Sequence, residues 1–378
     1  MRITGFRIVD LDVPVDPPFP AAWDPEPRRS MRQTLLVVET DEGLSGVSGG
    51  DLSGIEPYVR HFVGTDPTDL DTQARRVASC CYSGGRLWPI EAALYDVAGK
   101  AAGQSVAHML GGATDRVKAY ASAGSRRTPE EWATVVEARD ADGFDALKMR
   151  LDVFDPDLAI ACVEAARRTA PDGFALMVDL NQAWRMPGDV SPQASVDDVL
   201  AVVGPFAELG VTWLEEPLAL DDLAGLHRVR AAAGEMRVAG GEFLLASAES
   251  WRLLDDDVLG VFQQDVQLTL GITEGARFGR AVIATGGWYT PHTWGDAFSL
   301  LVNLHVTCGI GGGPWLEYPH DPPGWRAEVR DAILLDATEP DSDGWLHVPT
   351  GGGLGAALDW DTIDDLTVRA RDATSTAD

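Results

Sequence analysis

Three carboxylates stand at the ends of three successive short apolar segments: Asp179 in LMVDLNQAW, Glu215 in WLEEPL and Glu242 in AGGEF. If these segments are neighbouring parallel strands, which lie about 4.8 Å apart, the acids converge on one point. A single acid of this kind is more simply explained as a solvated loop charge or a helix N-cap. Three in succession favour a cation site, and an all-oxygen set suits Mg²⁺, because zinc prefers His and Cys.

Two cations precede these acids in the segment ALKMR, where Lys148 and Arg150 are two residues apart. On a strand this spacing places both on the same side, and we expect both to point into the predicted barrel. The chain has only three lysines, so lysine is an uncommon choice here. A cationic pair beside a metal suits an anionic substrate; the alternative is that both residues are ion-pair partners of barrel acids.

A possible base lies farther along the chain. Asp265 in FQQDVQ and His292 in YTPHTWGD end two later strand-like segments, close enough for a carboxylate–imidazole hydrogen bond that orients and tunes a base. A lone His is more often a satisfied core residue, but the neighbouring acid favours a functional role. Glu317 in PWLEYP ends the next segment, where it either hydrogen-bonds a developing enolate if protonated or is a surface acid.

The elements that must position these residues show a repeating strand–helix rhythm after about residue 117. Each short apolar segment is followed by an Ala- or Asp-rich helical stretch. The predicted strands cover residues 117–123, 146–150, 174–180, 211–215, 237–241, 260–265, 286–291 and 314–318. Eight parallel strands predict an α/β fold, a TIM-type (β/α) barrel with its active site at the carboxyl ends of the strands.

The flanking segments predict a second, α+β unit. Residues 1–47 alternate in strand fashion around a proline-rich stretch, VDPPFPAAWDPEP, which is expected to form a loop. Helical spacing follows, ending at a Gly pair suited to a helix C-cap. We therefore expect a capping domain at 1–115, a barrel at 116–324 and a C-terminal segment at 325–378 that returns to the cap.

Composition narrows the function classes. The chain has 378 residues, 45% of them hydrophobic, which is enough for a packed core. Its net charge of −29 argues against nucleic acid and anionic membranes as partners. The acids are spread along the whole chain, like the solvated surface of a protein from a salty cytoplasm. The N-terminus shows no signal-peptide pattern, and a cytoplasmic location is expected.

Several residues are assigned no chemistry. The four cysteines lack zinc-site or disulfide spacing and are expected to be small buried residues. The run GGGLGAAL at 351–358 lacks the strand–loop–helix context of a nucleotide site. Apart from His292, the histidines share no ligand spacing, and only His320, which follows Glu317 closely, is kept as a weak candidate.

At this point the sequence resembles the mandelate racemase group of the enolase superfamily over nearly its whole length. The motifs agree in order: IEAALYDVAGKAAGQSVAHMLGG, LKMR, VDLNQAW, WLEEP, GGE, the Asp265 and His292 segments, Glu317 and VPTGGGLGAALD. The resemblance implies Mg²⁺ on three barrel carboxylates, a substrate carboxylate bound to it, and removal of the α-proton to give a stabilised enediolate. It also implies that the cap, through the 15–32 loop and the segment near Ser53, covers the barrel mouth and selects the substrate.

Departures from the family pattern narrow the reaction. Racemising members carry a lysine base where this chain has Arg150, and arginine is a poor base. Asn181 stands where some acid-sugar dehydratases carry a histidine; it is assigned to substrate binding together with Lys148. His292 would then remove the α-proton and assist loss of the β-hydroxyl, as in an acid-sugar dehydratase acting on an aldonic or aldaric acid.

Two other classes stay open. If the pKa of Lys148 were lowered by Arg150 and the metal, a second base would allow a racemase, epimerase or cycloisomerase. A barrel that has lost turnover and serves as a binding protein is the third class. The sequence does not identify the sugar acid, although Trp184 and Trp294 are expected at the barrel mouth. A homo-oligomer is expected by resemblance alone.

Overall fold

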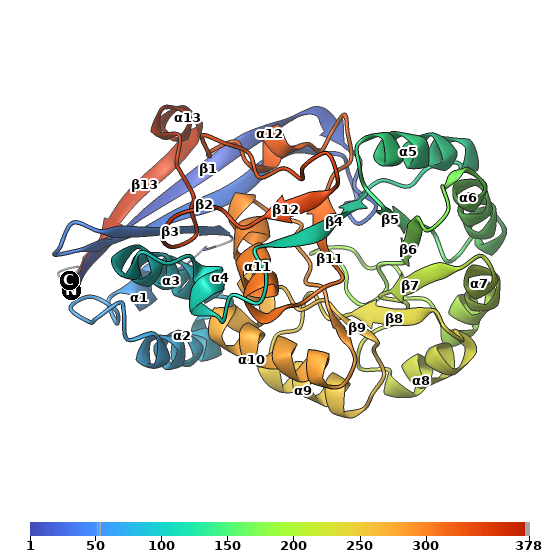
Figure 1. Ribbon diagram of the computed structural model, residues 1–378, viewed down its shortest axis with the longest axis horizontal. Helices are drawn as coiled ribbons and strands as arrows, with labels where there is room; N and C mark the ends of the chain where they lie inside the picture. The colour runs from blue at the N-terminus through green and yellow to red at the C-terminus, as the bar shows by residue number, and fades with distance from the viewer. Residues whose placement is uncertain (51, 53, 375–378) are drawn as a thin grey trace.

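The computed structural model describes residues 1–50, 52 and 54–374. An eight-stranded parallel sheet curls into a barrel, and a smaller antiparallel sheet with its own helices lies at its side (Figure 1). Strands β4 (Arg116–Ser122) to β11 (Trp315–Pro319) form the curled sheet, in the order β11-β4-β5-β6-β7-β8-β9-β10. The predicted α/β barrel with an α+β cap is confirmed.

Each barrel strand overlaps a predicted strand. Between the two ends lie β5 (Ala146–Arg150), β6 (Ala175–Asp179), β7 (Val211–Glu215), β8 (Arg237–Gly240), β9 (Val261–Phe262) and β10 (Trp288–Tyr289). The last two are shorter than expected, because ladder pairing there covers only two residues. Beyond that ladder, the Gly313 N–H donates to the Tyr289 carbonyl at 2.9 Å, which links β10 to the segment that enters β11.

Helices return the chain from the end of each strand to the start of the next. They are α5 (Pro129–Ala141), α6 (Pro156–Thr169), α7 (Val196–Glu208), α8 (Leu223–Ala232), α9 (Ser247–Asp255), α10 (Gly271–Ala284) and α11 (Ala297–Ile310), with the short η1 (Val266–Leu270) before α10. Many begin at a side chain that accepts a free backbone N–H. Thr128 and Ser195 do so within capping boxes, and Asp155 and Asp222 cap α6 and α8. Some of the many aspartates therefore stabilise the N-termini of helices.

Alternation along the strands separates the interior of the barrel from its outer wall. In β6, Leu176 and Val178 pack outward among the helices, whereas Ala175 and Met177 belong to a separate cluster that fills the barrel. That interior layer also contains Tyr120 and Trp213, whose rings meet edge to face at 5.2 Å. Apolar residues thus fill the lower barrel and leave polar residues to the carboxyl ends.

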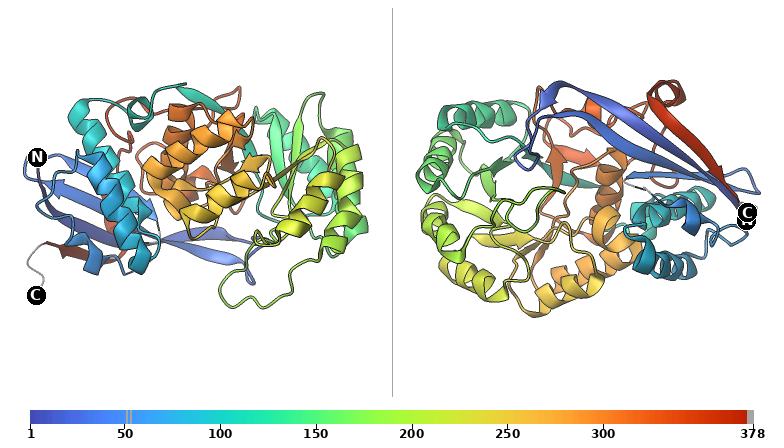
Figure 2. Two further views of the ribbon diagram at one scale, coloured as in Figure 1. Left: turned by 90° about the horizontal axis from the view of Figure 1, so that it is seen from below. Right: turned by 180° about the vertical axis from the view of Figure 1, so that it is seen from behind.

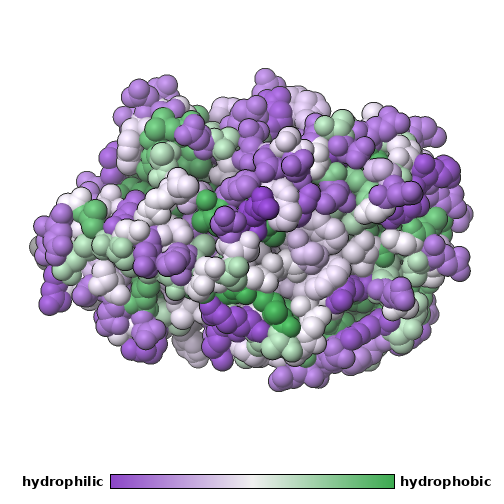
Figure 3. All heavy atoms as spheres, viewed as in Figure 1, coloured by the Kyte–Doolittle hydropathy of each residue, from purple (hydrophilic) through white to green (hydrophobic). Residues whose placement is uncertain are grey.

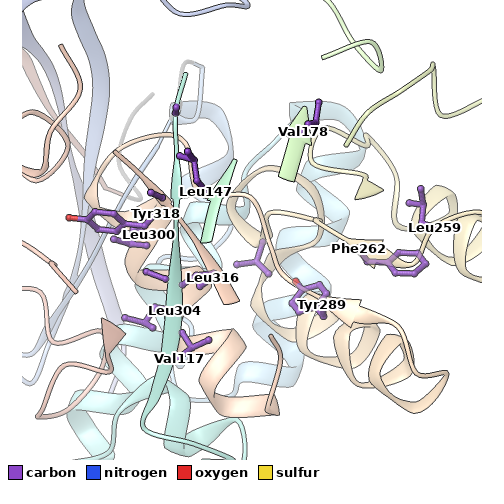
Figure 4. Packing of buried hydrophobic residues seen from close by; sticks show 14 of the residues in the cluster. Val117, Leu147, Val178, Leu259, Phe262, Tyr289, Leu300, Leu304, Leu316 and Tyr318 are labelled. Carbon is purple, nitrogen blue, oxygen red and sulfur yellow. The ribbon is translucent and has the colours of Figure 1, made fainter. Parts of the chain in front are cut away.

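The outer layer packs the helices on the sheet. Figure 4 shows Leu300 and Leu304 of α11 beside Leu316 of β11, and all three are fully buried. On the surface, hydrophilic residues cover most of the face seen in Figure 3, with apolar residues in small patches. Within the described residues, no helix combines the length and apolar character needed to span a membrane.

The cap is built on an antiparallel sheet of order β13-β1-β2-β3. Its strands are β1 (Ile3–Phe19), β2 (Arg28–Thr40), β3 (Ser45–Gly50) and β13 (Thr367–Ala373), and its helices are α1 (Glu56–Val59), α2 (Leu70–Gly84), α3 (Trp88–Ala102) and α4 (Val106–Met109). The C-terminal segment reaches both units: β12 (Trp345–His347) pairs with β4, and β13 pairs with β1. Two short helices, α12 (Ala327–Arg330) and α13 (Trp360–Leu366), belong to the same segment. The exact domain boundaries stay a prediction.

The expectation of a loop over the whole proline-rich stretch was wrong. Strand β1 continues to Phe19, which pairs with Arg28 of β2, so that only residues 20–27 connect the two strands. The prolines are tolerated because β13 pairs with β1 only from Phe6 to Leu11. Beyond Leu11, that side of β1 is an edge that needs no backbone donors. The resulting β1–β2 hairpin reaches the barrel mouth (Figure 2, right).

Candidate active site

Sheet register brings the predicted acids and cations to one end of the barrel. Arg150 is paired with Asp179, and Asp179 with Glu215, across the last positions of β5, β6 and β7. Glu242 follows two residues after the end of β8. All four residues are at most 2% exposed. The structure therefore gathers charged groups where an apolar interior would otherwise be expected.

Lys148 lies at the centre of this group and is fully buried. Its Nζ is 2.5 Å from Glu215 Oε1, 2.6 Å from Glu317 Oε1 and 3.7 Å from Asp179 Oδ2. The ammonium also lies over the ring of Tyr120, 5.6 Å from its centroid. Lys148 thus forms ion pairs with acids from three other strands, and its charge faces the space between them.

Arg150 is held by both the barrel and the cap. Its Nη1 forms an ion pair with Asp179 and also donates to Asn181 Oδ1 at 3.3 Å, while its Nε donates to the Ala123 carbonyl at 3.0 Å. Trp23 of the β1–β2 hairpin stacks on the guanidinium, whose Cζ lies 4.8 Å from the ring centroid. Asn181, the predicted substrate ligand, keeps a buried Nδ2 for which the described residues offer no hydrogen-bond acceptor.

Glu242 faces the candidate base. Its Oε2 is 3.8 Å from His292 Nε2 and has no hydrogen-bond partner within the described structure. Its Oε1 accepts from Trp184 Nε1 at 2.8 Å. Burial raises the pKa of Glu242, which the charge of His292 opposes and that of Glu215 reinforces. This carboxylate therefore has an open coordination site toward the centre of the cluster.

His292 and Asp265 form the predicted pair. His292 Nδ1 is 3.1 Å from Asp265 Oδ2, and Asp265 Oδ1 accepts from Asn303 Nδ2 and from the Gln267 N–H, both at 2.8 Å. Burial lowers the pKa of His292, but the charge of Glu242, the Asp265 hydrogen bond and the charge of Glu317 together raise it to about 9. The dyad leaves Nε2 facing the acid cluster.

Glu317 is buried, so the alternative of a surface acid is wrong. It accepts hydrogen bonds from the Ser122 hydroxyl and the Thr293 N–H, each at 2.8 Å, and pairs with Lys148. Although burial raises the pKa of this carboxyl, the charges of Lys148, His292 and Arg150 lower it to about 2. The surroundings therefore favour the ionised carboxylate, which accepts hydrogen bonds. The sequence had suggested a protonated Glu317 that donates a hydrogen bond to the enolate, and the surroundings do not favour that form.

The donor set fits a divalent cation of the oxygen-binding type. Within residues 1–50, 52 and 54–374, no three His, Cys, Asp or Glu side chains already form a closed metal group. Instead, Lys148 and Arg150 lie against Glu215 and Asp179. The unpartnered Glu242 Oε2, buried among further carboxylate oxygens, is the feature that a cation would satisfy.

Several residues of this site escaped the sequence reasoning. Glu216 is 1% exposed and its φ is 45°, and neither of its carboxylate oxygens has a hydrogen-bond partner in the described part of the chain. Gln263 Nε2 and Trp213 Nε1 both donate to Glu215 Oε2, at 2.7 and 3.0 Å. The doubled acid in WLEEP was the available signal for Glu216, since buried charges are uncommon without a role.

The hairpin closes one side of the barrel mouth. The Ala22 N–H donates to the Gly124 carbonyl at 2.7 Å, and the rings of Trp23 and Trp294 meet edge to face at 4.9 Å. Seen from below, the hairpin and the loop after β6 extend from the same end of the barrel (Figure 2, left). The predicted covering segment near Ser53 includes a residue that lies outside the described part of the chain.

Other motifs have structural surroundings. His320 packs against Phe144 and Tyr318, with ring centroids 5.8 Å away in each case, and burial lowers its pKa to about 4. In the glycine run, Gly353 lies against α3, where a Cβ on Gly99 would be 2.6 Å from the Gly353 Cα. This close approach explains why glycines occur at both places. The four cysteines are free thiols.

The fold and the site together define an α/β-barrel protein of the enolase superfamily. A sequence model described as enolase C-terminal domain-like matches residues 131–362, which is more than half of the chain. The chain therefore belongs to the enolase C-terminal domain-like family. The curated relatives of this chain are enzymes, among them a cycloisomerase and sugar-acid dehydratases.

Named relatives are distant. D-galactarolactone cycloisomerase from Agrobacterium fabrum is 25% identical, over 97% of this chain and 99% of that protein. L-talarate/galactarate dehydratase from Salmonella typhimurium is 29% identical, over 75% of this chain and 72% of that protein. The crystal structure of D-glucarate dehydratase from Agrobacterium tumefaciens, complexed with magnesium, has a TM-score of 0.83 and 23% identity, covering 98% of this chain and all of that one.

Proposed function

We propose that this protein removes the proton α to the carboxylate of a sugar acid and then eliminates the β-hydroxyl as water. The observation that carries the proposal is the arrangement of one buried base, His292, paired with Asp265 and facing an acid cluster that holds Lys148 and Arg150. An α-proton beside a carboxylate is too weakly acidic for an imidazole unless the new negative charge is stabilised as it forms.

Asp179, Glu215 and Glu242 would hold a Mg²⁺ ion, which when bound would bind the substrate carboxylate and stabilise the charge of the enediolate. Lys148 adds a positive charge at the same place, and Asn181 offers an amide donor. In its neutral form His292 accepts the α-proton at Nε2, while Asp265 keeps the other ring nitrogen protonated. The same imidazolium then gives its proton to the leaving hydroxyl, so that water departs and the enol becomes a keto-deoxy acid.

The dehydratase is preferred over a two-base reaction because of Arg150. Its guanidinium is bound to Asp179, Asn181 and the Ala123 carbonyl and stacked on Trp23. Arginine stays protonated at ordinary pH and does not serve as a base. With one base available, the proton that His292 removes returns to the leaving group on the same face.

An isomerase is the second candidate, and Lys148 is the reason. Lys148 forms an ion pair with Glu215, and His292 lies close to Glu242 in the same cluster of charged residues. A deprotonated Lys148 would supply a second base. A cycloisomerase is among the relatives and aligns over 97% of this chain, at 25% identity. Product mass separates the two candidates, since a dehydratase releases water and an isomerase leaves the mass unchanged.

The test is a screen of the purified protein with Mg²⁺ against aldonic and aldaric acids. Semicarbazide detects keto-deoxy products, and NMR in D₂O follows exchange of the α-proton. Keto-deoxy product that is lost in His292→Asn supports the dehydratase. Exchange or a product of equal mass without dehydration favours the isomerase, and a protein that binds these acids without exchange or product would be a binding protein.

A further inference from the structure

A cavity of about 580 Å³ lies between the cap and the mouth of the barrel, a volume suited to a small-molecule ligand. We call it the arginine cavity. Its polar lining comes from β2, from the segment between α2 and α3 and from the barrel, through Arg28, Arg32, Gln33, Arg86, Gln267 and Asp296. Both units of the fold therefore contribute to it.

The arginine cavity adjoins the proposed base. Phe243 lines it and lies 5.7 Å, centroid to centroid, from the His292 ring. Trp294, another lining residue, follows His292 by two positions. Gln267 donates its backbone N–H to Asp265, the partner of His292. A sugar acid that presents its α-carbon to His292 thus has this cavity beside it for its other end.

The charge of the arginine cavity is opposite to that of the whole protein. The chain has 59 acidic against 30 basic residues, yet the described residues that line this space include three arginines and one aspartate. Arg28 is paired with Asp24 at 2.8 Å, whereas the exposed side chain of Arg32 has no hydrogen bond or ion pair with another described residue. Burial raises the pKa of Asp296 to about 6, so this carboxyl is closer to protonation than an ordinary aspartate.

Buried polar atoms without partners line the same space. Gln33 is 5% exposed, and neither its Nε2 nor its Oε1 has a hydrogen-bond partner among the described residues. The same holds for Gln267 Oε1 and Asp296 Oδ2. Buried polar groups are nearly always hydrogen-bonded, because leaving one unsatisfied costs stability. Of these four atoms, Gln33 Nε2 is a donor that a carboxylate would satisfy, and the three acceptors suit the hydroxyl groups of a polar ligand.

A neighbouring cavity of about 660 Å³ shares Arg32 and Gln33 but has a different charge balance. Among its described lining residues, the three arginines Arg32, Arg369 and Arg371 are matched by three acids, and Arg371 is bound to two of these acids, Asp10 and Glu56. Paired charges of this kind give no preference for an added anion. The excess of positive charge is therefore on the side of Arg32 that faces the barrel mouth.

We propose that the arginine cavity binds the second carboxylate of a dicarboxylic sugar acid, with Arg32 as its cationic ligand and Gln33 as a hydrogen-bond donor. This inference rests on the proposed function and narrows it, because it makes the substrates aldaric rather than aldonic acids. Arginine suits the role, since its guanidinium matches the geometry of a carboxylate.

The experiment compares matched pairs of acids: galactarate with D-galactonate, D-glucarate with D-gluconate and D-mannarate with D-mannonate. The wild-type protein is expected to have a higher kcat/KM for one diacid than for the monoacid of the same configuration. Arg32→Gln is expected to lower kcat/KM for that diacid roughly ten- to hundredfold, the usual range for a hydrogen bond to a charged group, and to leave the monoacid nearly unchanged. Arg32→Lys should restore part of the loss.

The control is Arg29→Gln, which removes the same charge from the same strand at an exposed residue outside the cavity lining. It should leave both acids unaffected. Binding is also measured by calorimetry in His292→Asn with Mg²⁺, where the diacid should bind more weakly once Arg32→Gln is added.

The outcomes separate the two proposals. Dehydration with a preference for monoacids, or an equal effect of Arg32→Gln on both acids, overturns the dicarboxylate inference and leaves the dehydratase standing. Binding of a diacid that depends on Arg32, without proton exchange or product in the wild type, supports the cavity and overturns the dehydratase. Absence of diacid binding overturns the inference outright.

Discussion

Replacing Asp265 by Asn tests the orientation of the proposed base. Asp265 Oδ1 accepts two N–H groups, from Asn303 and Gln267, at 2.8 Å each. An Asn at this position keeps its carbonyl oxygen toward these donors and turns its NH₂ group toward His292 Nδ1. The ring nitrogen must then accept a hydrogen bond, so the ring proton moves to Nε2, which no longer accepts the substrate proton.

The size of the effect follows from the loss of general-base catalysis, because a His292 tautomer protonated at Nε2 cannot accept the substrate proton. General-base catalysis contributes about 10²–10⁴-fold, or roughly 3–5 kcal/mol of barrier. We expect Asp265→Asn to lower kcat by this range while KM changes little, because Asp265 touches His292 and not the predicted substrate ligands. The pKa of His292 should also fall, since the Asp265 hydrogen bond is one of the contacts that raise it.

The assay is steady-state kinetics on the acid identified by the screen, with pH profiles for wild type and variant. Asn303→Leu is the matched comparison, because it loosens Asp265 but keeps its carboxylate, and a loss of about tenfold is expected. Circular dichroism and retained stabilisation by Mg²⁺ show that each variant is folded. A kcat within threefold of wild type for Asp265→Asn would refute the reasoning.

Two further predictions concern stability. Glu242→Gln removes the negative charge of a buried carboxylate whose Oε2 has no hydrogen-bond partner among the described residues, so the metal-free protein should become more stable by about 1–3 kcal/mol. The rise in Tm caused by Mg²⁺ should be largely lost. Urea unfolding with and without Mg²⁺ measures both effects, and an unchanged response to Mg²⁺ would contradict the assigned ligand. His305 accepts the Ala107 N–H and lies near the Leu354 carbonyl, and burial lowers its pKa to about 4. Its contribution to stability is present above the ordinary His pKa of 6.5 and is lost as the pH falls toward 4, which amounts to about 2 kcal/mol by pH 5. His305→Gln should weaken the pH dependence of unfolding between pH 7 and 5, the exposed His227→Gln should not, and equal curves for all three proteins would contradict the linkage.

The strand ends were the most predictable part of the molecule. In β5, β6 and β7 the inward positions alternate with outward apolar ones, and the last inward position is Arg150, Asp179 or Glu215. A charged residue at the end of such a strand can be recognised in the sequence, because the buried strands of a barrel are otherwise apolar. The family motifs then placed Glu242, Asp265 and His292 in order along the chain.

Contacts across the barrel were not predictable in the same way. The pairing of Lys148 with Glu317 joins β5 to β11, and the hydrogen bond from Trp184 to Glu242 spans 58 positions. Neither follows from local periodicity. The proline-rich stretch was wrongly predicted to be a loop. Whether a strand tolerates proline there depends on where β13 stops pairing with β1, and local sequence does not determine that tertiary contact.

The most direct test of the central claim is exchange of the α-proton in D₂O, measured by NMR for wild type and His292→Asn with Mg²⁺ and the acid found in the screen. The account predicts that the wild type forms a keto-deoxy product and that His292→Asn neither forms product nor incorporates deuterium at the α-carbon. Undiminished exchange in His292→Asn would contradict His292 as the base and transfer that role to Lys148.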